Sequence, residues 1–261
     1  MSNDLVELLP AVAAIARQAG AAIMEVYQRA EGPAVEWKAD DSPLTEADRA
    51  ANARINAGLE ALGPPYPIVS EENAPIPFAE RRHFERYWLV DPLDGTREFI
   101  GRNGEFTVNI ALIEAGFPVL GVVYVPATGA LYRAASGMGA WREYAGETTR
   151  LQAARFRADA AGLRVLASRS HLDERTRAFI AGLSAPQLVQ RGSSLKMLML
   201  AEGEADLYPR LGPTSEWDTA APQMILEEAG GQVLHWESGA RLAYNKEELA
   251  NPYFLARGIA V

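Results

Sequence analysis

The stretch Trp88-Leu89-Val90-Asp91-Pro92-Leu93-Asp94-Gly95-Thr96 decides the fold and points to the chemistry of this chain. Its apolar start predicts a short buried strand over 87–90, which runs directly into two aspartates three positions apart. Pro92 restricts the turn between them, and Gly95 lets another backbone or a ligand approach closely. Asp91 therefore carries its charge to the end of a strand that is too apolar to be exposed.

Three other segments also place carboxylates at the ends of predicted elements. These acids are Glu71 and Glu72 after a strand at 68–69, Asp218 at the start of a helix over 219–229, and Asp48 at the start of a helix that begins near Thr45. Each segment has a structural interpretation as well. These interpretations are a solvated loop for Glu71 and Glu72, a capping box for Thr45 and Asp48, an N-cap for Asp218, and turn positions for Asp91 and Asp94.

Taken together, the acids favour a metal site. Two carboxylates about 4 Å apart repel by roughly 4 kcal/mol at an effective dielectric near 20, so converging acids need raised pKa values or bound cations. The chain has no cysteine and no pair of histidines at metal spacing, so the candidate ligands are all oxygens. Oxygen ligands select Mg²⁺ or Mn²⁺ over zinc. Gly95-Thr96 is predicted to open a helix whose free N–H groups would hold a phosphate, which indicates phosphoryl chemistry.

The rest of the chain predicts layered helices and sheets. Residues 1–155 form an α+β part and residues 156–261 an α/β part, with no flexible linker between them. The predicted helices cover 5–27, 173–183, 195–201 and 219–229, besides the one that begins near Thr45. The predicted strands cover 68–69, 87–90, 106–112, 119–125, 130–134, 140–142, 163–167 and 205–208, with 233–234 as the last core strand.

Composition excludes several classes of protein. The net charge of −9 disfavours binding to a nucleic-acid polymer. No uninterrupted apolar run approaches the roughly 18–20 residues that span a bilayer, and the N-terminus lacks the pattern of a secretory signal. We therefore expect a cytoplasmic protein without an integral membrane segment, and the absence of cysteine fits a reducing compartment. Neither the dinucleotide-binding nor the P-loop glycine fingerprint is present.

The run 91–96, the later run Trp217-Asp218-Thr219-Ala220-Ala221 and the upstream Glu71 resemble the motifs of the inositol-monophosphatase superfamily in order and spacing. The likeness covers nearly the whole chain. Two longer runs, 94–100 and 102–112, resemble the bacterial 3′(2′),5′-bisphosphate nucleotidases of this superfamily, because inositol monophosphatases usually carry Asn-Phe after Asp-Gly-Thr. Shorter runs that are similar to the same branch are Ser168–His171, Gly192–Lys196 and Tyr208–Arg210. Arg97 departs from the pattern, since many relatives have lysine there, but the charge is kept.

The resemblance implies a layered αβαβα sandwich of the inositol-monophosphatase and fructose-1,6-bisphosphatase type. It also implies two or three Mg²⁺ ions, with Mn²⁺ as a substitute and Li⁺ as an inhibitor. Their ligands would be Glu71, Asp91, Asp94, Asp218 and the backbone carbonyl of Leu93. The catalytic residues would be Glu71, Asp48 and Thr96, the last two orienting and deprotonating the attacking water.

The substrate contacts that the resemblance implies are Gly95, Thr96, His171, Ser193, Ser194, Lys196 and Asp218. Simpler interpretations of some of them stay open. His171 is also compatible with an ordinary loop histidine, Ser193 and Ser194 with caps of the following helix, and Lys196 with a solvated helix face.

The implied activity is hydrolysis of adenosine 3′,5′-bisphosphate to AMP and phosphate by metal-activated water, in sulfur metabolism or nucleotide recycling. One alternative is an inositol monophosphatase or broad-specificity sugar phosphatase of the same superfamily. A more distant alternative is a non-catalytic metal- or nucleotide-binding protein. The expected partner is a small-molecule nucleotide, with monomer or homodimer, and peripheral attachment to the inner membrane, left open.

Overall fold

A seven-stranded sheet forms the centre of the molecule. The computed structural model describes residues 3–29, 35–37, 43–168 and 173–261. Across these residues the sheet has the order β3-β4-β5-β6-β7-β8-β9, in which β3 and β4 are parallel and all other neighbours antiparallel. Its strands are β3 (Ile68–Ser70), β4 (Arg86–Asp94), β5 (Thr107–Glu114), β6 (Phe117–Val125), β7 (Ala130–Ala135), β8 (Ala140–Tyr144) and β9 (Glu147–Arg150).

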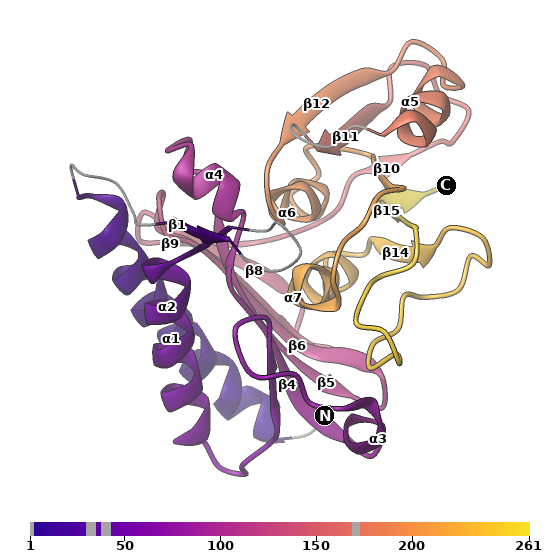
Figure 1. Ribbon diagram of the computed structural model, residues 1–261. Helices are drawn as coiled ribbons and strands as arrows, with labels where there is room; N and C mark the ends of the chain where they lie inside the picture. The colour runs from indigo at the N-terminus through magenta and orange to yellow at the C-terminus, as the bar shows by residue number, and fades with distance from the viewer. Residues whose placement is uncertain (1–2, 30–34, 38–42, 169–172) are drawn as a thin grey trace.

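Alternating side chains give this sheet two apolar faces, because successive residues of a strand point to opposite sides. In β4, Trp88 and Val90 join the core beneath α1 and α2, whereas Tyr87 and Leu89 join the core beneath α6 and α7. The described helices are α1 (Asn3–Tyr27), α2 (Glu46–Glu60), α3 (Phe78–Arg81), α4 (Thr96–Ile100), α5 (Glu174–Ala181), α6 (Leu195–Ala201) and α7 (Glu216–Glu228). Helices therefore cover both faces of the central sheet (Figure 1).

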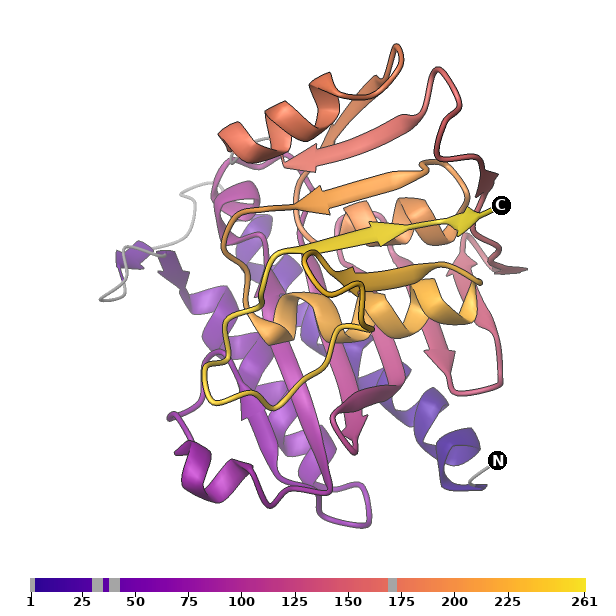
Figure 2. The same cartoon turned by 90° about the vertical axis from the view of Figure 1, so that its right-hand side faces the viewer.

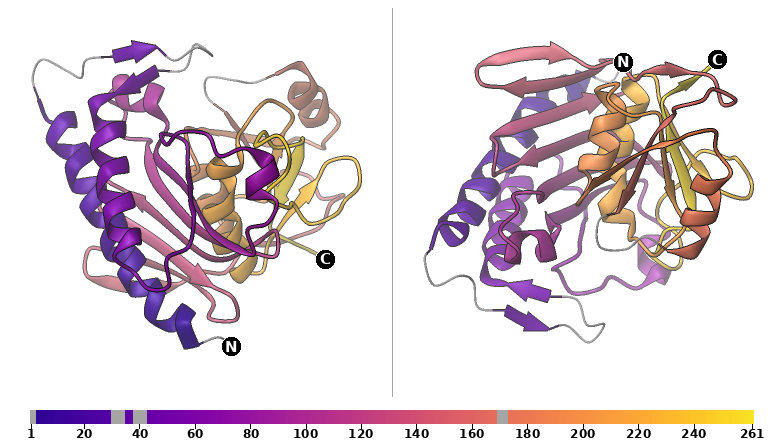
Figure 3. Two further views of the ribbon diagram at one scale, coloured as in Figure 1. Left: turned by 60° about the horizontal axis from the view of Figure 1, so that its bottom comes forward. Right: turned by 90° about the horizontal axis from the view of Figure 1, so that it is seen from above.

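A second sheet packs on the far side of α6 and α7 (Figure 2). In the described part of the chain it has five strands in the order β12-β11-β13-β15-β14. They are β11 (Arg164–Ser168), β12 (Gln187–Arg191), β13 (Leu207–Arg210), β14 (Gln232–His235) and β15 (Phe254–Arg257). Phe179 and Ile180 of α5 pack on its outer face against Val165 and Leu207. The layers thus follow the order αβαβα, which confirms the fold that the resemblance implied (Figure 3).

The structure corrects some of the predicted strands. The strand at 233–234 is not the last one of the core, because β15 lies between β13 and β14. β12 is an edge strand with mostly exposed residues and lacks the apolar pattern that predicts a strand. β15 contains the short apolar run Phe254-Leu255-Ala256 but was not predicted. The short pairs β1 (Val35–Trp37) with β2 (Pro43–Thr45) and β10 (Arg155–Phe156) with β16 (Ile259–Ala260) were not predicted either.

The two large sheets lie on either side of the predicted division between residues 155 and 156. Residue 155 itself belongs to β10, whose parallel partner is the C-terminal β16. The end of the N-terminal part therefore pairs with a strand of the C-terminal part. The separation into an N-terminal part of residues 1–155 and a C-terminal part of residues 156–261 stays a proposal.

One described helix, over Asp4–Tyr27, is long and apolar enough to cross a membrane by length and composition alone. Charged residues interrupt its apolar runs, so the sequence predicts a helix here but no membrane span. In the structure half of its apolar window is buried, and it packs on α2 and the central sheet. A core helix of a soluble protein passes the same test, so this helix is weak evidence for membrane insertion.

Helix α7 approaches the central sheet over a row of small residues. Ala111, Gly121 and Ala134 lie side by side on β5, β6 and β7. A Cβ atom added at Gly121 would lie 2.5 Å from the carbonyl oxygen of Ala221 and 2.9 Å from Cβ of Met224. Both atoms belong to the body of the helix, so no rotation of a flexible side chain could relieve the clash. Gly121 thereby sets the height of α7 above the sheet.

We expect Gly121→Ala to lower the stability of the protein by about 1–3 kcal/mol, the usual cost of overpacking a core. Activity should fall further than stability alone explains, because α7 also carries Asp218. Thermal unfolding and turnover measured on the same preparation check this. Gly182→Ala is a matched control, since its added Cβ would meet nothing closer than 3.4 Å. Equal stability of the two variants would contradict the packing argument.

Candidate active site

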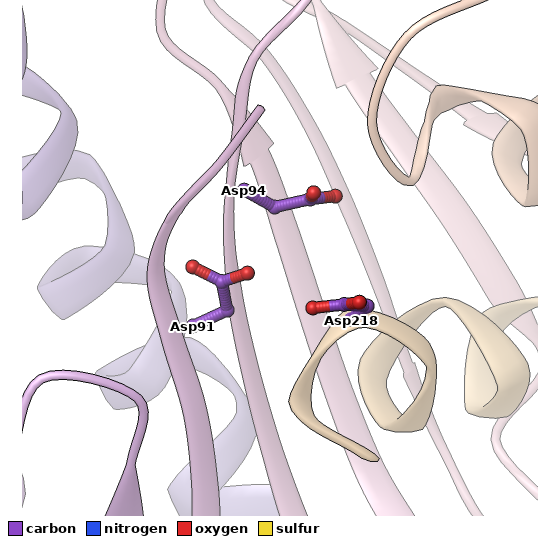
Figure 4. A group of neighbouring side chains, drawn as sticks. All are labelled: Asp91, Asp94 and Asp218. Atoms are coloured by element: carbon purple, nitrogen blue, oxygen red, sulfur yellow. The ribbon is translucent and has the colours of Figure 1, made fainter. Parts of the chain in front are cut away.

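Three aspartates from two distant segments converge beside the end of the central sheet. Asp91 and Asp94 come from β4 and Asp218 from the first turn of α7 (Figure 4). One carboxylate oxygen of each lies within 4.8 Å of the others. The convergence predicted from the sequence is therefore present for these three residues.

A β-bulge brings Asp91 and Asp94 to the same side of the sheet. Residues three apart on a regular strand point to opposite faces. Here Asp91 pairs with Asn109 and Asp94 with Thr107, so three steps along β4 match two along β5. The extra residue reverses the alternation, and Pro92, which cannot donate to the ladder, lies within the bulge. Both carboxylates can then face α7.

Glu71 reaches the site along the neighbouring parallel strand. Ser70 of β3 pairs with Val90 of β4, so Glu71 and Asp91 follow paired residues at the same edge. The N–H of Glu71 donates to the carbonyl of Val90 at 3.2 Å. Glu71 lines the same cavity as the three aspartates, and its charge acts on Asp91 and Asp218. It lies in a turn and is half-buried, and it is thus a loop residue that also contributes to the site.

Asp218 is held in place at the start of α7. The N-cap is Ser215, and Asp218 is the third helical residue, which accepts a hydrogen bond from the Ser215 N–H at 2.9 Å. Asp218 is therefore not the N-cap of α7, which lies three positions earlier in the chain. Glu216, the first residue of α7, anchors the start of the helix. Its fully buried carboxylate pairs with the ammonium of Lys246 at 2.5 Å and accepts the N–H of Asn245 at 2.7 Å.

The crowded acids bind protons more readily than isolated ones do. Burial raises the pKa of Asp91 well above its usual range, and the charges of Glu71, Asp94 and Asp218 raise it further. Burial, together with Asp94 and Glu71, also raises the pKa of Asp218 to about 8. A divalent cation can replace these protons, and an all-oxygen ligand set suits Mg²⁺ or Mn²⁺. The residues present therefore fit a divalent metal site.

Asp48 and Thr96 meet at the edge of this cluster. The hydroxyl of Thr96 lies 3.3 Å from Oδ1 of Asp48 and 3.3 Å from the carbonyl oxygen of Leu93, so it can donate to either. The other oxygen of Asp48 accepts the N–H and the hydroxyl of Thr45. The bond from the Thr45 N–H is one half of a capping box, in which the Thr45 side chain in turn accepts the N–H of Asp48. The capping-box interpretation is confirmed, and the same carboxylate also faces Thr96. Burial raises the pKa of Asp48.

A cavity of about 350 Å³ opens in front of these residues. The predicted site residues that line it are Glu71, Asp91, Leu93, Asp94, Gly95, Thr96, Ser193, Ser194, Lys196 and Asp218. The leucine has a buried side chain and would act through its carbonyl. Asp48 lies behind Thr96 and is only 2% exposed. His171 lies outside the described residues.

The structure tests two of the simpler interpretations of the substrate-side residues, and the one for Lys196 is wrong. Lys196 is only 5% exposed and lies in the cavity wall, so it is not on a solvated face. Its ammonium donates to the carbonyl of Ser193 at 2.5 Å, and burial lowers its pKa to about 8. Ser194 is the N-cap residue of α6, but its hydroxyl contacts Thr107 at 2.7 Å and Asn109 at 3.0 Å and makes no capping hydrogen bond to the helix.

Three residues of the site were missing from the sequence prediction. Thr107 and Asn109 of β5 are fully buried and contact Asp94 and the two serines before α6. Their signal was the pair of polar side chains inside an otherwise apolar strand. Arg210 lines the cavity and its Nε has no hydrogen-bond partner among the described residues. Its signal was the run Tyr208-Pro209-Arg210, which resembled the nucleotidase branch.

Five layers with a partly buried acidic cluster at the end of the central sheet define an αβαβα-sandwich protein with a site that suits divalent cations. The chain belongs to the inositol monophosphatase family, whose family model matches residues 4–260.

Similar proteins agree with this assignment. The chain is 50% identical over 248 residues to a Salmonella typhimurium protein described as 3′(2′),5′-bisphosphate nucleotidase CysQ, covering 95% of this chain and 98% of that relative. The crystal structure of CysQ from Bacteroides thetaiotaomicron matches with a TM-score of 0.83 and 41% identity, over 95% of this chain and 97% of that one. An inositol monophosphatase from Anabaena, 24% identical with a TM-score of 0.75 over 99% and 93% of the chains, shares the fold.

The raised pKa of Asp218 predicts how the metal-free protein responds to pH. An acid whose pKa rises on folding from 3.8 to about 8 binds more protons in the folded than in the unfolded state between these values. Stability should therefore fall as the pH rises through this window, and Mg²⁺ should raise the unfolding temperature more at about pH 8 than at about pH 5.5. Thermal unfolding with chelator or Mg²⁺ measures both effects.

Asp218→Asn is the matched control, because its amide oxygen can still accept the Ser215 N–H. Its metal-free stability should depend less on pH than that of the unaltered protein. An identical pH dependence in both would show that these acids do not carry the effect.

Proposed function

We propose that this protein is a magnesium-dependent 3′(2′),5′-bisphosphate nucleotidase that hydrolyses adenosine 3′,5′-bisphosphate to AMP and phosphate. The observation that carries the proposal is one cavity that is lined both by clustered acids and by basic side chains. Asp91, Asp94 and Asp218 form the acidic cluster, where bound cations would hold the phosphate that is cleaved. Lys196 and Arg210 line the same cavity and would bind a second phosphate directly. A substrate with two separated phosphates matches this arrangement.

The metal site would be formed by Glu71, Asp91, Asp94, Asp218 and the Leu93 carbonyl. A divalent cation bound there supplies Lewis-acid activation of water and charge for the leaving oxygen. The number of ions, two or three, is part of the proposal. Such a contribution is needed, because phosphate monoesters are among the slowest compounds to hydrolyse and one general base supplies only about 10²–10⁴-fold.

Thr96 and Asp48 would position the attacking water. When the Thr96 hydroxyl donates its hydrogen to Asp48, its lone pairs can accept a hydrogen bond from a water in the cavity and aim it at phosphorus. Burial raises the pKa of Asp48, which makes it a stronger base than an exposed aspartate. The N–H groups of Gly95 and Thr96, at the start of α4, would hold the phosphate.

The remaining substrate contacts would come from the C-terminal part of the chain. Ser193 and Ser194 would lie against the nucleotide beside Lys196, and His171 would complete the contacts. The proposed activity belongs to sulfur metabolism in the cytoplasm. Mn²⁺ would replace Mg²⁺, and Li⁺ would inhibit.

A substrate panel tests the proposed activity. Phosphate release from adenosine 3′,5′-bisphosphate should require Mg²⁺ and exceed release from AMP and inositol 1-phosphate by at least about tenfold in kcat/KM, because these two compounds offer only one phosphate. It should also exceed release from fructose 1,6-bisphosphate, which has two phosphates but lacks the nucleoside that Ser193 and Ser194 would contact. A clear preference for inositol 1-phosphate would assign the protein to the other branch of the family. Nucleotide binding without Mg²⁺-dependent phosphate release would favour a non-catalytic protein.

Asp94→Asn tests the metal assignment. Turnover should fall by about 10²-fold or more, since a lost ligand removes several kcal/mol of charge stabilisation from the transition state. The unfolding temperature should stay unchanged or rise, because one of the crowded charges disappears and the amide oxygen can still accept from Ser193 and Ser194. Asp159→Asn at an exposed position is the control. Retention of most Mg²⁺-dependent activity in the Asp94 variant would refute the assignment.

A further inference from the structure

Glu105 connects the two parts of the chain at the edge of the active site. It belongs to the run 102–112 that resembled the nucleotidase branch, and it has no place in the proposed chemistry. Its carboxylate oxygen Oε2 accepts the N–H of Gly192 at 2.7 Å. Gly192 starts the turn 192–194, which leads from β12 into α6. One side chain of the N-terminal part therefore holds a backbone group of the C-terminal part.

The turn 192–194 is in direct contact with the metal site. The hydroxyl of Ser193 and the N–H of Ser194 both donate to Oδ2 of Asp94 at 2.6 Å. Ser193 has a φ of 51°, in the left-handed region that residues other than glycine rarely adopt. Such a conformation persists only where its surroundings enforce it. The anchors of this turn are thus Asp94 on one side and Glu105 on the other.

The space around the turn leaves little room for the turn to shift. A Cβ atom at Gly192 would lie 2.7 Å from Cγ of Glu98 and 3.2 Å from the carbonyl oxygen of Glu105. A Cβ atom at Gly95 would lie 3.3 Å from Cβ of Ser193. The turn is therefore enclosed between the start of α4 and the segment that leads into β5.

The same turn positions the cation that would face a second phosphate. The ammonium of Lys196 donates to the carbonyl of Ser193 at 2.5 Å and lines the cavity. Any movement of the turn would displace Lys196. Asp94 would move less, because it also pairs with Thr107 in the sheet and both residues are held by the β4–β5 ladder.

We propose that Glu105 is a positioning residue for substrate specificity. By holding the Gly192 N–H it fixes the turn 192–194, so that Lys196 meets the phosphate of the nucleotide that is not cleaved. The inference rests on the proposed nucleotidase function. It assigns to Glu105 an effect on the binding of the bisphosphate that is larger than its effect on the hydrolysis of a simple phosphate ester.

Two substitutions separate the hydrogen bond from the charge. Glu105→Ala removes the acceptor, whereas Glu105→Gln keeps an amide oxygen that can accept the Gly192 N–H. With Mg²⁺ and adenosine 3′,5′-bisphosphate, the alanine variant should raise KM by about tenfold or more, as expected for a lost charge-assisted hydrogen bond. Its kcat/KM for p-nitrophenyl phosphate, which has no second phosphate, should change less than about threefold. The glutamine variant and the exposed control Glu147→Ala should resemble the unaltered protein.

Amide hydrogen exchange provides a readout that does not depend on activity. In the alanine variant without substrate, exchange in the turn 192–194 should become faster, while exchange in β5 stays the same. Unchanged exchange in this turn would overturn the proposal. So would equal losses on both substrates, or a glutamine variant as defective as the alanine variant. If the unaltered protein does not hydrolyse the bisphosphate, the nucleotidase function fails, and the exchange experiment still decides whether Glu105 holds the turn.

Discussion

The repulsion between carboxylates gathered at one partly buried point is the constraint on which the rest of this structure depends. Asp91, Asp94 and Asp218 approach within 4.8 Å, with Glu71 close enough for its charge to act on two of them. Left alone, such groups would separate or take up protons. They stay together because strand β4 holds Asp91 and Asp94 while the start of helix α7 holds Asp218, and the site therefore favours bound cations. The repulsion lowers the folding stability of the metal-free protein, and the same repulsion favours the binding of cations.

Local hydrogen bonds hold each of these acids. The β-bulge of β4 turns Asp91 and Asp94 to one side, and the N–H of Leu93 donates to Asp91 at 3.0 Å. A capping box holds Asp218 at the start of α7. These features also have ordinary structural roles, as a bulge and a helix cap. Structural and functional interpretations of one acid are therefore compatible, and the capping box of Asp48 is a second example.

The layers decide where these held acids meet. Helix α7 lies between the two sheets and contacts the central one through Gly121, so the start of the helix arrives at the end of β4. Glu216 and Lys246 anchor that start, and Arg81 from α3 donates to the carbonyl groups of Lys246 and Glu247. The turn 192–194 brings the C-terminal part against Asp94 from the other direction. Substrate-side and metal-side residues thus share contacts rather than forming separate sites.

The sequence by itself determined the main helices, most strands of the central sheet and the identity of the acids. These features depend on neighbouring residues: an amphipathic period, an apolar run before Asp91, or a cap two or three positions away. It also indicated the family, because the motifs are contiguous. Only the tertiary structure decided what depends on distant contacts. Such features join residues far apart in the chain, and no local pattern of side chains specifies these pairings. They are the place of β15 in its sheet, the burial of Lys196, the contacts of Thr107 and Asn109, and the hydrogen bond from Gly192 to Glu105.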